Sequence, residues 1–239
     1  MYEFSSRIRY SEIDCSGKLN LHGIVNYLQD CSTFQSESLG AGVESLHQEN
    51  LVWVLSTWQI DIKKYPSLGD KVTVCTFPYE YKGYFAKRNF LIKDEFDNVI
   101  VSADSLWTLL DYKESKPVRI TEKMYQIYTL EDKYPMEYIK GKIRIPDTST
   151  QCSPVKMLRH NLDTNYHVNN GQYIGLMLDA LENSGTKPYD YTRLRVEYRK
   201  MTRLDDTLIP YVGINENSHT VVYFKDEEQD ITTVMELYD

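Results

Sequence analysis

The chain has 239 residues, enough for one large or two small domains and for a substantial buried core. Apolar residues make up 41% and charged residues 26%, which is ordinary for a folded globular protein and argues against a disordered or coiled-coil chain. The formal net charge of −8 argues against general nucleic-acid binding, because such binding draws its affinity from Lys and Arg side chains that neutralise phosphates.

No stretch approaches the run of roughly 18 uncharged apolar residues that a membrane span needs. The first residues include Glu3 and lack the apolar core of a signal peptide, so a cytoplasmic protein is expected. The cysteines are scattered without Cys-x-x-Cys spacing, which predicts neither a disulfide framework nor a zinc site. They are Cys15, Cys31, Cys75 and Cys152.

The first half of the chain opens with a turn-rich segment, residues 9–20, and continues with apolar residues at helical spacing. Asn20 is a suitable N-cap and Gly40 a suitable C-terminal stop, so we expect a long helix between them. Four runs rich in β-branched and aromatic residues follow, separated by turn signals, and each is expected to be a strand. These runs are residues 53–62, 70–81, 84–94 and 99–112.

A segment without clear periodicity follows, from about Glu122 to Gln151, and it is punctuated by Pro135 and Pro146. We expect this segment to connect two structural units. The predicted boundaries are 1–123 for an N-terminal unit, 124–151 for the connector and 152–239 for a C-terminal unit.

The second half repeats the plan of the first. When Asp163 is aligned with Asp14, a second turn-rich segment is followed by a second helical pattern, with Asn169 or Asn170 as its cap and Gly185 near its end. The sequence therefore predicts an α+β fold of two tandem units, each with one long helix and about four antiparallel strands. The strands expected in this half are residues 192–201, 206–214, 219–227 and 230–238.

These features resemble the acyl-acyl-carrier-protein thioesterases of plants and bacteria. The run HVNN at residues 167–170, with YIG at 173–175, is similar to that family's second-half signature, and the first-half strands are similar in order and spacing. The resemblance implies two tandem hotdog units, each a long helix wrapped by a curved antiparallel sheet. It also implies hydrolysis of a fatty acyl thioester on acyl carrier protein in fatty acid biosynthesis, with no metal and no organic cofactor.

The segment LDTNYHVNN, residues 162–170, holds the candidate catalytic residues. His167 is the candidate general base, since its ordinary pKa of about 6.5 leaves a neutral imidazole near pH 7. Asp163 could orient it and Asn165 could hold the water or the thioester carbonyl, and the resemblance carries catalytic roles onto these three positions. Asp and Asn before a helix are more often caps or turn formers, so the prediction depends on the conjunction of the three. Whether Asp163 or His167 takes the proton stays open.

The first half serves as an internal control. At the positions aligned with Asn165 and His167 it has Ser16 and Lys18, so one active site per chain is predicted, in the C-terminal unit.

In plant members the strand resembling VEYRKMT continues into Glu-Cys, which some proposals make catalytic, but Met201 and Thr202 stand there in this chain. Neither can be a thiolate or a carboxylate base, so direct attack by water is favoured over an acyl-enzyme.

The N-terminal unit is expected to hold the acyl chain, and acyl carrier protein, which is strongly acidic, to dock on basic stretches. Pocket candidates, which ordinarily would be core residues, are Ile24, Tyr27, Leu28, Trp53, Trp58, Phe85, Phe90 and Trp107. The basic stretches contain Lys82, Lys87 and Arg88 in the first half, and Arg193, Arg195, Arg199, Lys200 and Arg203 in the second.

Three other functions fit the same pattern. An acyl-coenzyme A thioesterase would act on the same thioester with a different carrier. A non-catalytic protein that binds acyl thioesters, or a dehydratase acting on a β-hydroxyacyl group, would share the hotdog fold. Two fused units already supply the dimer that single hotdogs need, so both a monomer and a homodimer are open.

Overall fold

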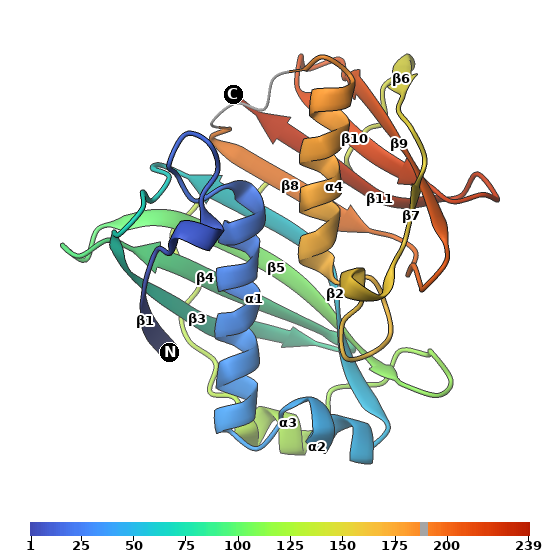
Figure 1. Cartoon of the computed structure of the whole chain (residues 1–239). Helices are drawn as coiled ribbons and strands as arrows, with labels where there is room; N and C mark the ends of the chain where they lie inside the picture. The colour runs from blue at the N-terminus through green and yellow to red at the C-terminus, as the bar shows by residue number, and fades with distance from the viewer. Residues whose placement is uncertain (187–190) are drawn as a thin grey trace. The chain divides into compact units, whose positions relative to one another are not determined.

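The computed structural model describes residues 1–186 and 191–239, which form two compact units, Met1–Tyr138 and Ile139–Asp239. Each unit has one long helix lying against an antiparallel sheet (Figure 1). None of the helices in these two ranges is both long and apolar enough to cross a membrane.

Unit 1 consists of a five-stranded sheet, the long helix α1 and three short helices. All neighbouring strands are antiparallel, in the order β1-β3-β4-β5-β2. The strands are β1 (Tyr2–Arg7), β2 (Leu51–Ile62), β3 (Lys71–Lys82), β4 (Phe85–Lys93) and β5 (Val99–Asp111). The helices are η1 (Tyr10–Glu12), α1 (Leu21–Ser38), α2 (Val43–Gln48) and α3 (Glu122–Ile127).

Helix α1 begins and ends where the sequence predicts. The Asn20 side chain accepts a hydrogen bond from Gly23 N at 2.9 Å, which satisfies one of the free amides of the first turn. Gly40 has φ +69°, the left-handed conformation that commonly ends a helix and that glycine adopts without strain. Between these ends the apolar residues recur every three or four positions and are buried, among them Ile24 and Leu28.

Unit 2 repeats this architecture. Its strand order is β8-β11-β10-β9-β6, with β7 also paired to β9, and each strand occupies the place of its counterpart in unit 1. The internal repeat is therefore confirmed by topology. The elements are β6 (Ser149–Gln151), β7 (Val155–Lys156), η2 (Arg159–Asn161), α4 (Asn170–Asn183), β8 (Arg193–Tyr198), β9 (Thr207–Ile214), β10 (Thr220–Lys225) and β11 (Ile231–Tyr238).

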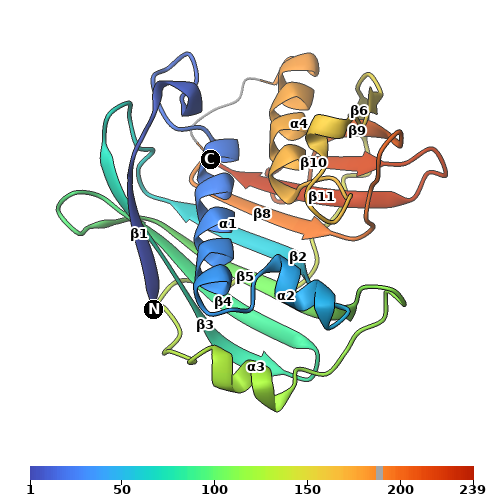
Figure 2. The ribbon, with the colours of Figure 1, turned by 60° about the horizontal axis from the view of Figure 1, so that its bottom comes forward.

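The shortest elements were not predicted from the sequence, and several strand ends differ from their predicted positions by up to three residues. Strand β8 ends at Tyr198, before the expected Met201, and β1, β6, β7, α2 and α3 were not expected. Figure 2 shows α2 and α3 near each other beside the unit 1 sheet, where side chains from both helices join one buried cluster.

The expected connector, residues 124–151, is exposed over much of its length but is attached to both units by a few buried residues. Met124 and Tyr128 are buried in a cluster of unit 1, and Asn89 accepts a hydrogen bond from Tyr134 N at 3.0 Å. Ile143 is buried in a cluster of unit 2. The segment therefore belongs in part to each unit.

Candidate active site

The turn between η2 and α4 contains all three candidate catalytic residues. It closes through a hydrogen bond from Asp163 N to His167 O at 2.8 Å, flanked by a bridge between Leu162 and Val168. Asn169 then caps α4, its side chain accepting from Gly171 N at 2.8 Å. The turn is thus fixed to the N-terminus of a 14-residue helix, where the helix dipole favours negative charge.

The carboxylate of Asp163 lies at the centre of this turn. One of its oxygens accepts from Asn165 N at 2.7 Å and from His167 N at 3.2 Å. The Asn165 amide lies 3.5 Å from the other oxygen. The three residues are therefore brought together, and Asp163 serves as an Asx-turn former that holds the other two.

His167 is half-buried in this turn, and its backbone pairs with Arg203 across an isolated bridge. Burial lowers the pKa of the imidazole, nearby Asp163 raises it, and Arg203 lowers it. Among the residues that the structure describes, none forms a hydrogen bond with either ring nitrogen. A neutral imidazole with an available nitrogen is what a general base for water requires near pH 7.

The turn of unit 1 has the same backbone arrangement. Asp14 N donates to Lys18 O at 2.9 Å, and the Asp14 carboxylate accepts from Ser16 N at 2.8 Å and from Ser16 Oγ at 2.6 Å. The role of the aspartate in shaping the turn is therefore common to both units. The imidazole belongs only to unit 2.

Tyr166 is a feature of the site that the sequence reasoning missed. It has φ +60° and its side chain is 75% exposed, whereas the matching position in unit 1 is Gly17, with φ +78°. A bulky residue in the left-handed region is strained, and such strain is found preferentially at functional sites. The internal alignment of Tyr with Gly was the signal that could have revealed it.

The segment after β8 forms the next layer of the site. Thr202 is buried, and its carbonyl accepts from Val168 N at 2.9 Å. Met201 is 41% exposed. Strand β8 ends at Tyr198, before Met201, and Glu197 within it accepts from Ile143 N at 2.6 Å.

None of the three buried cysteines has an activated thiol. Cys31, Cys75 and Cys152 are buried and unbridged, while Cys15 is exposed and also unbridged. Burial raises the pKa of Cys31 to about 12 and that of Cys75 to about 11, and it also raises the pKa of Cys152. Protonated thiols are poor nucleophiles, which agrees with attack by water.

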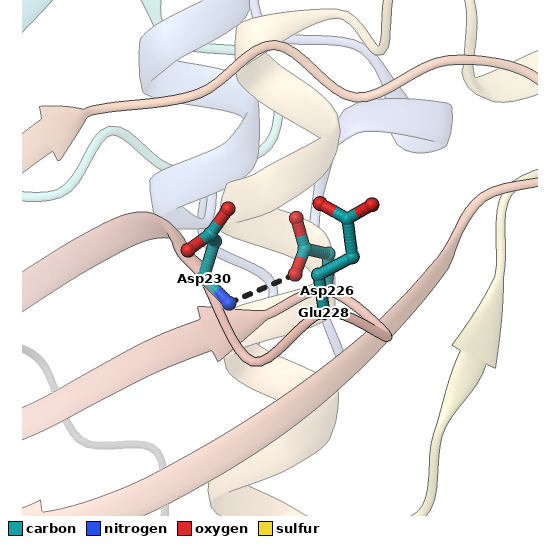
Figure 3. Close-up of side chains that lie close together, drawn as sticks. All are labelled: Asp226, Glu228 and Asp230. Atoms are coloured by element: carbon teal, nitrogen blue, oxygen red, sulfur yellow. Dashed lines mark hydrogen bonds between the residues drawn. The ribbon is translucent and has the colours of Figure 1, made fainter.

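One acidic cluster lies in the hairpin between β10 and β11, formed by Asp226, Glu228 and Asp230 (Figure 3). Asp226 accepts from Asp230 N at 2.9 Å, which closes the turn. The Lys200 ammonium contacts all three carboxylates, at 2.6, 3.2 and 2.8 Å, and occupies the position that a cation would take. The cluster is thus a hairpin held by lysine.

Most of the basic residues expected to dock an acidic partner are already engaged. Arg88 is buried, donating to Gln35 and to Thr76 Oγ1, so its inclusion in a docking surface was wrong. The other engaged side chains are Lys87 with Glu80, Arg195 with Glu236, Arg199 with Glu197 and Lys200 with its three acids.

The expected pocket residues of unit 1 are mostly core. Trp58 and Phe90 contact each other with ring centroids 4.9 Å apart, and Trp53 and Trp107 are partly buried beside the cluster that includes Leu109. Phe85 is 41% exposed. The remaining candidates, Ile24, Tyr27 and Leu28, are buried.

Two stretches of the chain match models of one protein family. Residues 1–128 match the acyl-ACP thioesterase N-terminal domain, and residues 146–234 match the acyl-ACP thioesterase C-terminal domain. A chloroplast acyl-[acyl-carrier-protein] hydrolase of Cuphea viscosissima is 27% identical over 228 residues, covering 90% of this chain and 54% of that protein. Oleoyl-acyl carrier protein thioesterase 1 of Arabidopsis thaliana is 23% identical over 218 residues, covering 84% and 60%. The chain thus spans little more than half the length of these relatives.

Two solved structures share the fold. The 12:0-ACP thioesterase from Umbellularia californica superposes with a TM-score of 0.88 at 18% identity, covering 99% of this chain and 96% of that one. An acyl-ACP thioesterase from Bacteroides thetaiotaomicron superposes with a TM-score of 0.85 at 22% identity, with the same coverage of 99% and 96%. The expected fold of two tandem hotdog units is confirmed.

Proposed function

Since the chain belongs to the acyl-ACP thioesterase family, we propose that it hydrolyses the thioester of a fatty acyl-acyl carrier protein and releases the free fatty acid. Water is the second substrate, and the thiol of the phosphopantetheine arm is the second product. Unit 2 carries the catalytic residues and unit 1 accommodates the acyl chain.

In the proposed reaction, His167 takes a proton from water as the water oxygen attacks the thioester carbonyl. Because the carboxylate of Asp163 is occupied by two backbone amides of the turn, we assign the base to His167 and a positioning role to Asp163. The Asn165 amide holds the water or the carbonyl without adding charge. The positive end of the α4 dipole, at the N-terminus of the helix, favours the negative charge that develops on the carbonyl oxygen.

The observation that carries this proposal is the half-buried imidazole of His167 in a turn whose repeat in unit 1 has Lys18 instead. A lysine at pH 7 is protonated and cannot act as a base. The acyl-coenzyme A thioesterase reading shares this chemistry and differs only in the carrier, so it stays the second candidate.

The experiment measures the thiol and the fatty acid released from two matched substrate series, acyl-carrier-protein and acyl-coenzyme A, each with several acyl chain lengths. The wild type is compared with His167→Ala, and Lys18→Ala is the matched control. Faster turnover of the carrier-protein series, lost only in His167→Ala, supports the proposal. Preference for coenzyme A would transfer the function to the second candidate, and binding without turnover of either series would contradict both.

We also propose a smaller docking surface, restricted to the rim of the candidate turn. Leu158, Tyr166 and Leu204 are exposed there, with the exposed cations Arg159 and Arg203 beside them. An apolar patch with a basic rim suits an acidic protein surface with an apolar centre.

The rim charges predict a specific kinetic effect. Arg159→Glu is expected to raise KM for acyl-carrier-protein substrates by roughly 3- to 10-fold and to leave KM for acyl-coenzyme A nearly unchanged, because a rim charge acts on encounter with the partner. Lys113→Glu, at an exposed turn of unit 1, is the control. An equal rise for both substrates would contradict docking at this rim.

A further inference from the structure

Strand β1 forms one edge of the unit 1 sheet. Its six residues pair with β3 alone among the described strands, and β1 lies beside β3 at the margin of the sheet (Figure 1). At the corresponding edge of unit 2 lies β6, which has only three residues. Edge strands present unpaired backbone groups to which another chain can bond, and most are short or interrupted. The longer, proline-free edge of unit 1 is therefore a candidate interface.

The backbone groups of β1 alternate between β3 and the free edge. Ile8 N donates to Asp70 O at 3.0 Å, which continues the register of the β1–β3 pairing, so the backbone of Ile8 is directed towards that side. Successive residues of an antiparallel strand direct their N–H and C=O groups to opposite sides, so Glu3, Ser5 and Arg7 direct theirs away from β3. These three residues can bond to a further strand without losing a bond to β3.

The side chains of the same three residues lie on the exposed face of β1. Glu3, Ser5 and Arg7 are exposed, whereas the side chains that alternate with them are partly buried. Arg7 lies directly opposite Lys71 of β3, and like charges in that arrangement are unfavourable. Neither cation forms an ion pair within the described ranges. A carboxylate placed beside Arg7 would offset this repulsion.

The exposed face of β1 is complementary in charge to a second copy of itself. When two β1 strands are paired in antiparallel order about a two-fold axis at Ser5, each Glu3 lies opposite Arg7 of the partner subunit. All outward N–H and C=O groups of the three residues are then paired. A register shifted by two residues loses both ion pairs, and one shifted by a single residue places outward groups opposite groups already bonded to β3. One register is therefore preferred.

The other face of this edge is apolar. The ring centroid of Phe4 lies 5.3 Å from that of Phe34 and 6.2 Å from that of Tyr27, both on α1. Phe34 is nevertheless 45% exposed. The two-fold pairing places α1 of both copies on the same face of the joined sheet, so the apolar surface at Phe4 and Phe34 borders the new strand pair. Covering that surface favours association.

We propose that two copies of this chain associate through β1, in antiparallel order about Ser5, so that their unit 1 sheets become continuous. A single strand pair buries less than the roughly 1,600 Å² of a standard interface, so the dimer is expected to be weak and to depend on concentration. This inference goes beyond the proposed function and does not depend on it.

The first test is sedimentation equilibrium. The wild type is expected to dimerise with a Kd of the order of 10 μM to 1 mM. Glu3→Arg and Arg7→Glu each place like charges opposite one another at both ends of the strand pair, so each should raise the Kd at least about 10-fold. An equimolar mixture of these two variants should dimerise again, because the arginines of one chain then face the glutamates of the other. Lys113→Glu, at an exposed turn of unit 1, is the control and should not change the Kd.

Three results of this experiment would overturn the proposal. They are a wild type that stays monomeric up to about 1 mM, single variants that dimerise as well as the wild type, and a mixture that fails to restore the dimer.

The second test locates the interface by amide hydrogen exchange. Between low and high protein concentration, exchange at Glu3, Ser5 and Arg7 should slow, whereas the Phe4 amide, directed at β3, should be protected at both. Ser5→Pro removes the central outward N–H but no bond to β3, so it should abolish the dimer and leave a folded monomer by circular dichroism. Unchanged exchange at concentrations where the wild type is dimeric would place the interface elsewhere and overturn the proposal.

Discussion

The turn before α1 and the turn before α4 close with the same hydrogen bonds, from Asp14 N to Lys18 O at 2.9 Å and from Asp163 N to His167 O at 2.8 Å. Each aspartate accepts from the backbone amide two residues later, at 2.8 and 2.7 Å. The hydrogen bonds shared by the two turns are therefore those that form the turn itself. We expect the residues that matter for function to be those that differ between the turns, His167 and Tyr166.

The largest expected effect comes from giving unit 2 the residue of unit 1. His167→Lys should lower kcat at least about 100-fold, because the side chain at the base position would then be protonated at pH 7. Thiol release from the preferred acyl thioester measures this. Lys18→His is the reciprocal control and should leave kcat within twofold; if it were the variant that lost activity, the assignment of the site to unit 2 would be wrong.

The two aspartates allow turn formation and catalysis to be separated. Asp14→Ala and Asp163→Ala should each lower the free energy of unfolding by about 1 kcal/mol, since each loses hydrogen bonds to the backbone of its turn. Only Asp163→Ala should also lower kcat, by about 10-fold, because it releases His167 from its position. Urea unfolding and steady-state kinetics measure the two effects, and equal kinetic losses in both variants would remove the distinction between the turns.

The pH dependence of kcat/KM should change in opposite directions in two variants. In the wild type the acid limb should lie below pH 6.5, the ordinary pKa of histidine, because burial lowers the pKa of His167 and a general base must be unprotonated. Arg203→Gln removes a cation that lowers this pKa, so the limb should move to higher pH. Asp163→Asn removes an anion that raises it, so the limb should move to lower pH.

The matching position in unit 1 supplies the control for this titration. Ser67 pairs with Lys18 as Arg203 pairs with His167, and Ser67→Ala should leave the pH profile unchanged. A profile that shifts in neither Arg203→Gln nor Asp163→Asn would show that a group other than His167 titrates in the acid limb.

The smallest expected effect concerns backbone strain. Tyr166→Gly should raise the free energy of unfolding by up to about 1 kcal/mol, because glycine adopts φ +60° without strain. Gly17→Ala should lower it by a similar amount through φ alone, since a Cβ there meets no atom within 4 Å. Urea unfolding measures both. A stabilised Tyr166→Gly with a higher KM would identify Tyr166 as a substrate contact.

Most of the fold was predictable because its long elements have clear periodicity and clear ends. Asn20 and Asn169 cap their helices as expected, and the eight main strands lie close to their predicted places. The missed elements are short: α2 and α3 have six residues each and β7 has two, too few to establish a period.

The candidate turn was also predictable, because its residues are contiguous in the sequence. The surroundings were not, because they depend on contacts between distant residues. Buried Arg88 donates hydrogen bonds to Gln35, 53 positions away in the sequence, and to Thr76, 12 positions away. These contacts could not be read from the residues next to Arg88.

The edge of the unit 2 sheet beyond β9 is covered by β6 and β7, of three and two residues, with Pro154 in the link between them. Proline lacks an N–H group and interrupts the hydrogen-bonding row that a further strand would need. Short interrupted strands are a common protection against pairing between sheets of different molecules. Concentrated solutions of the protein should therefore resist aggregation through this edge and stay clear on heating until one of the units unfolds.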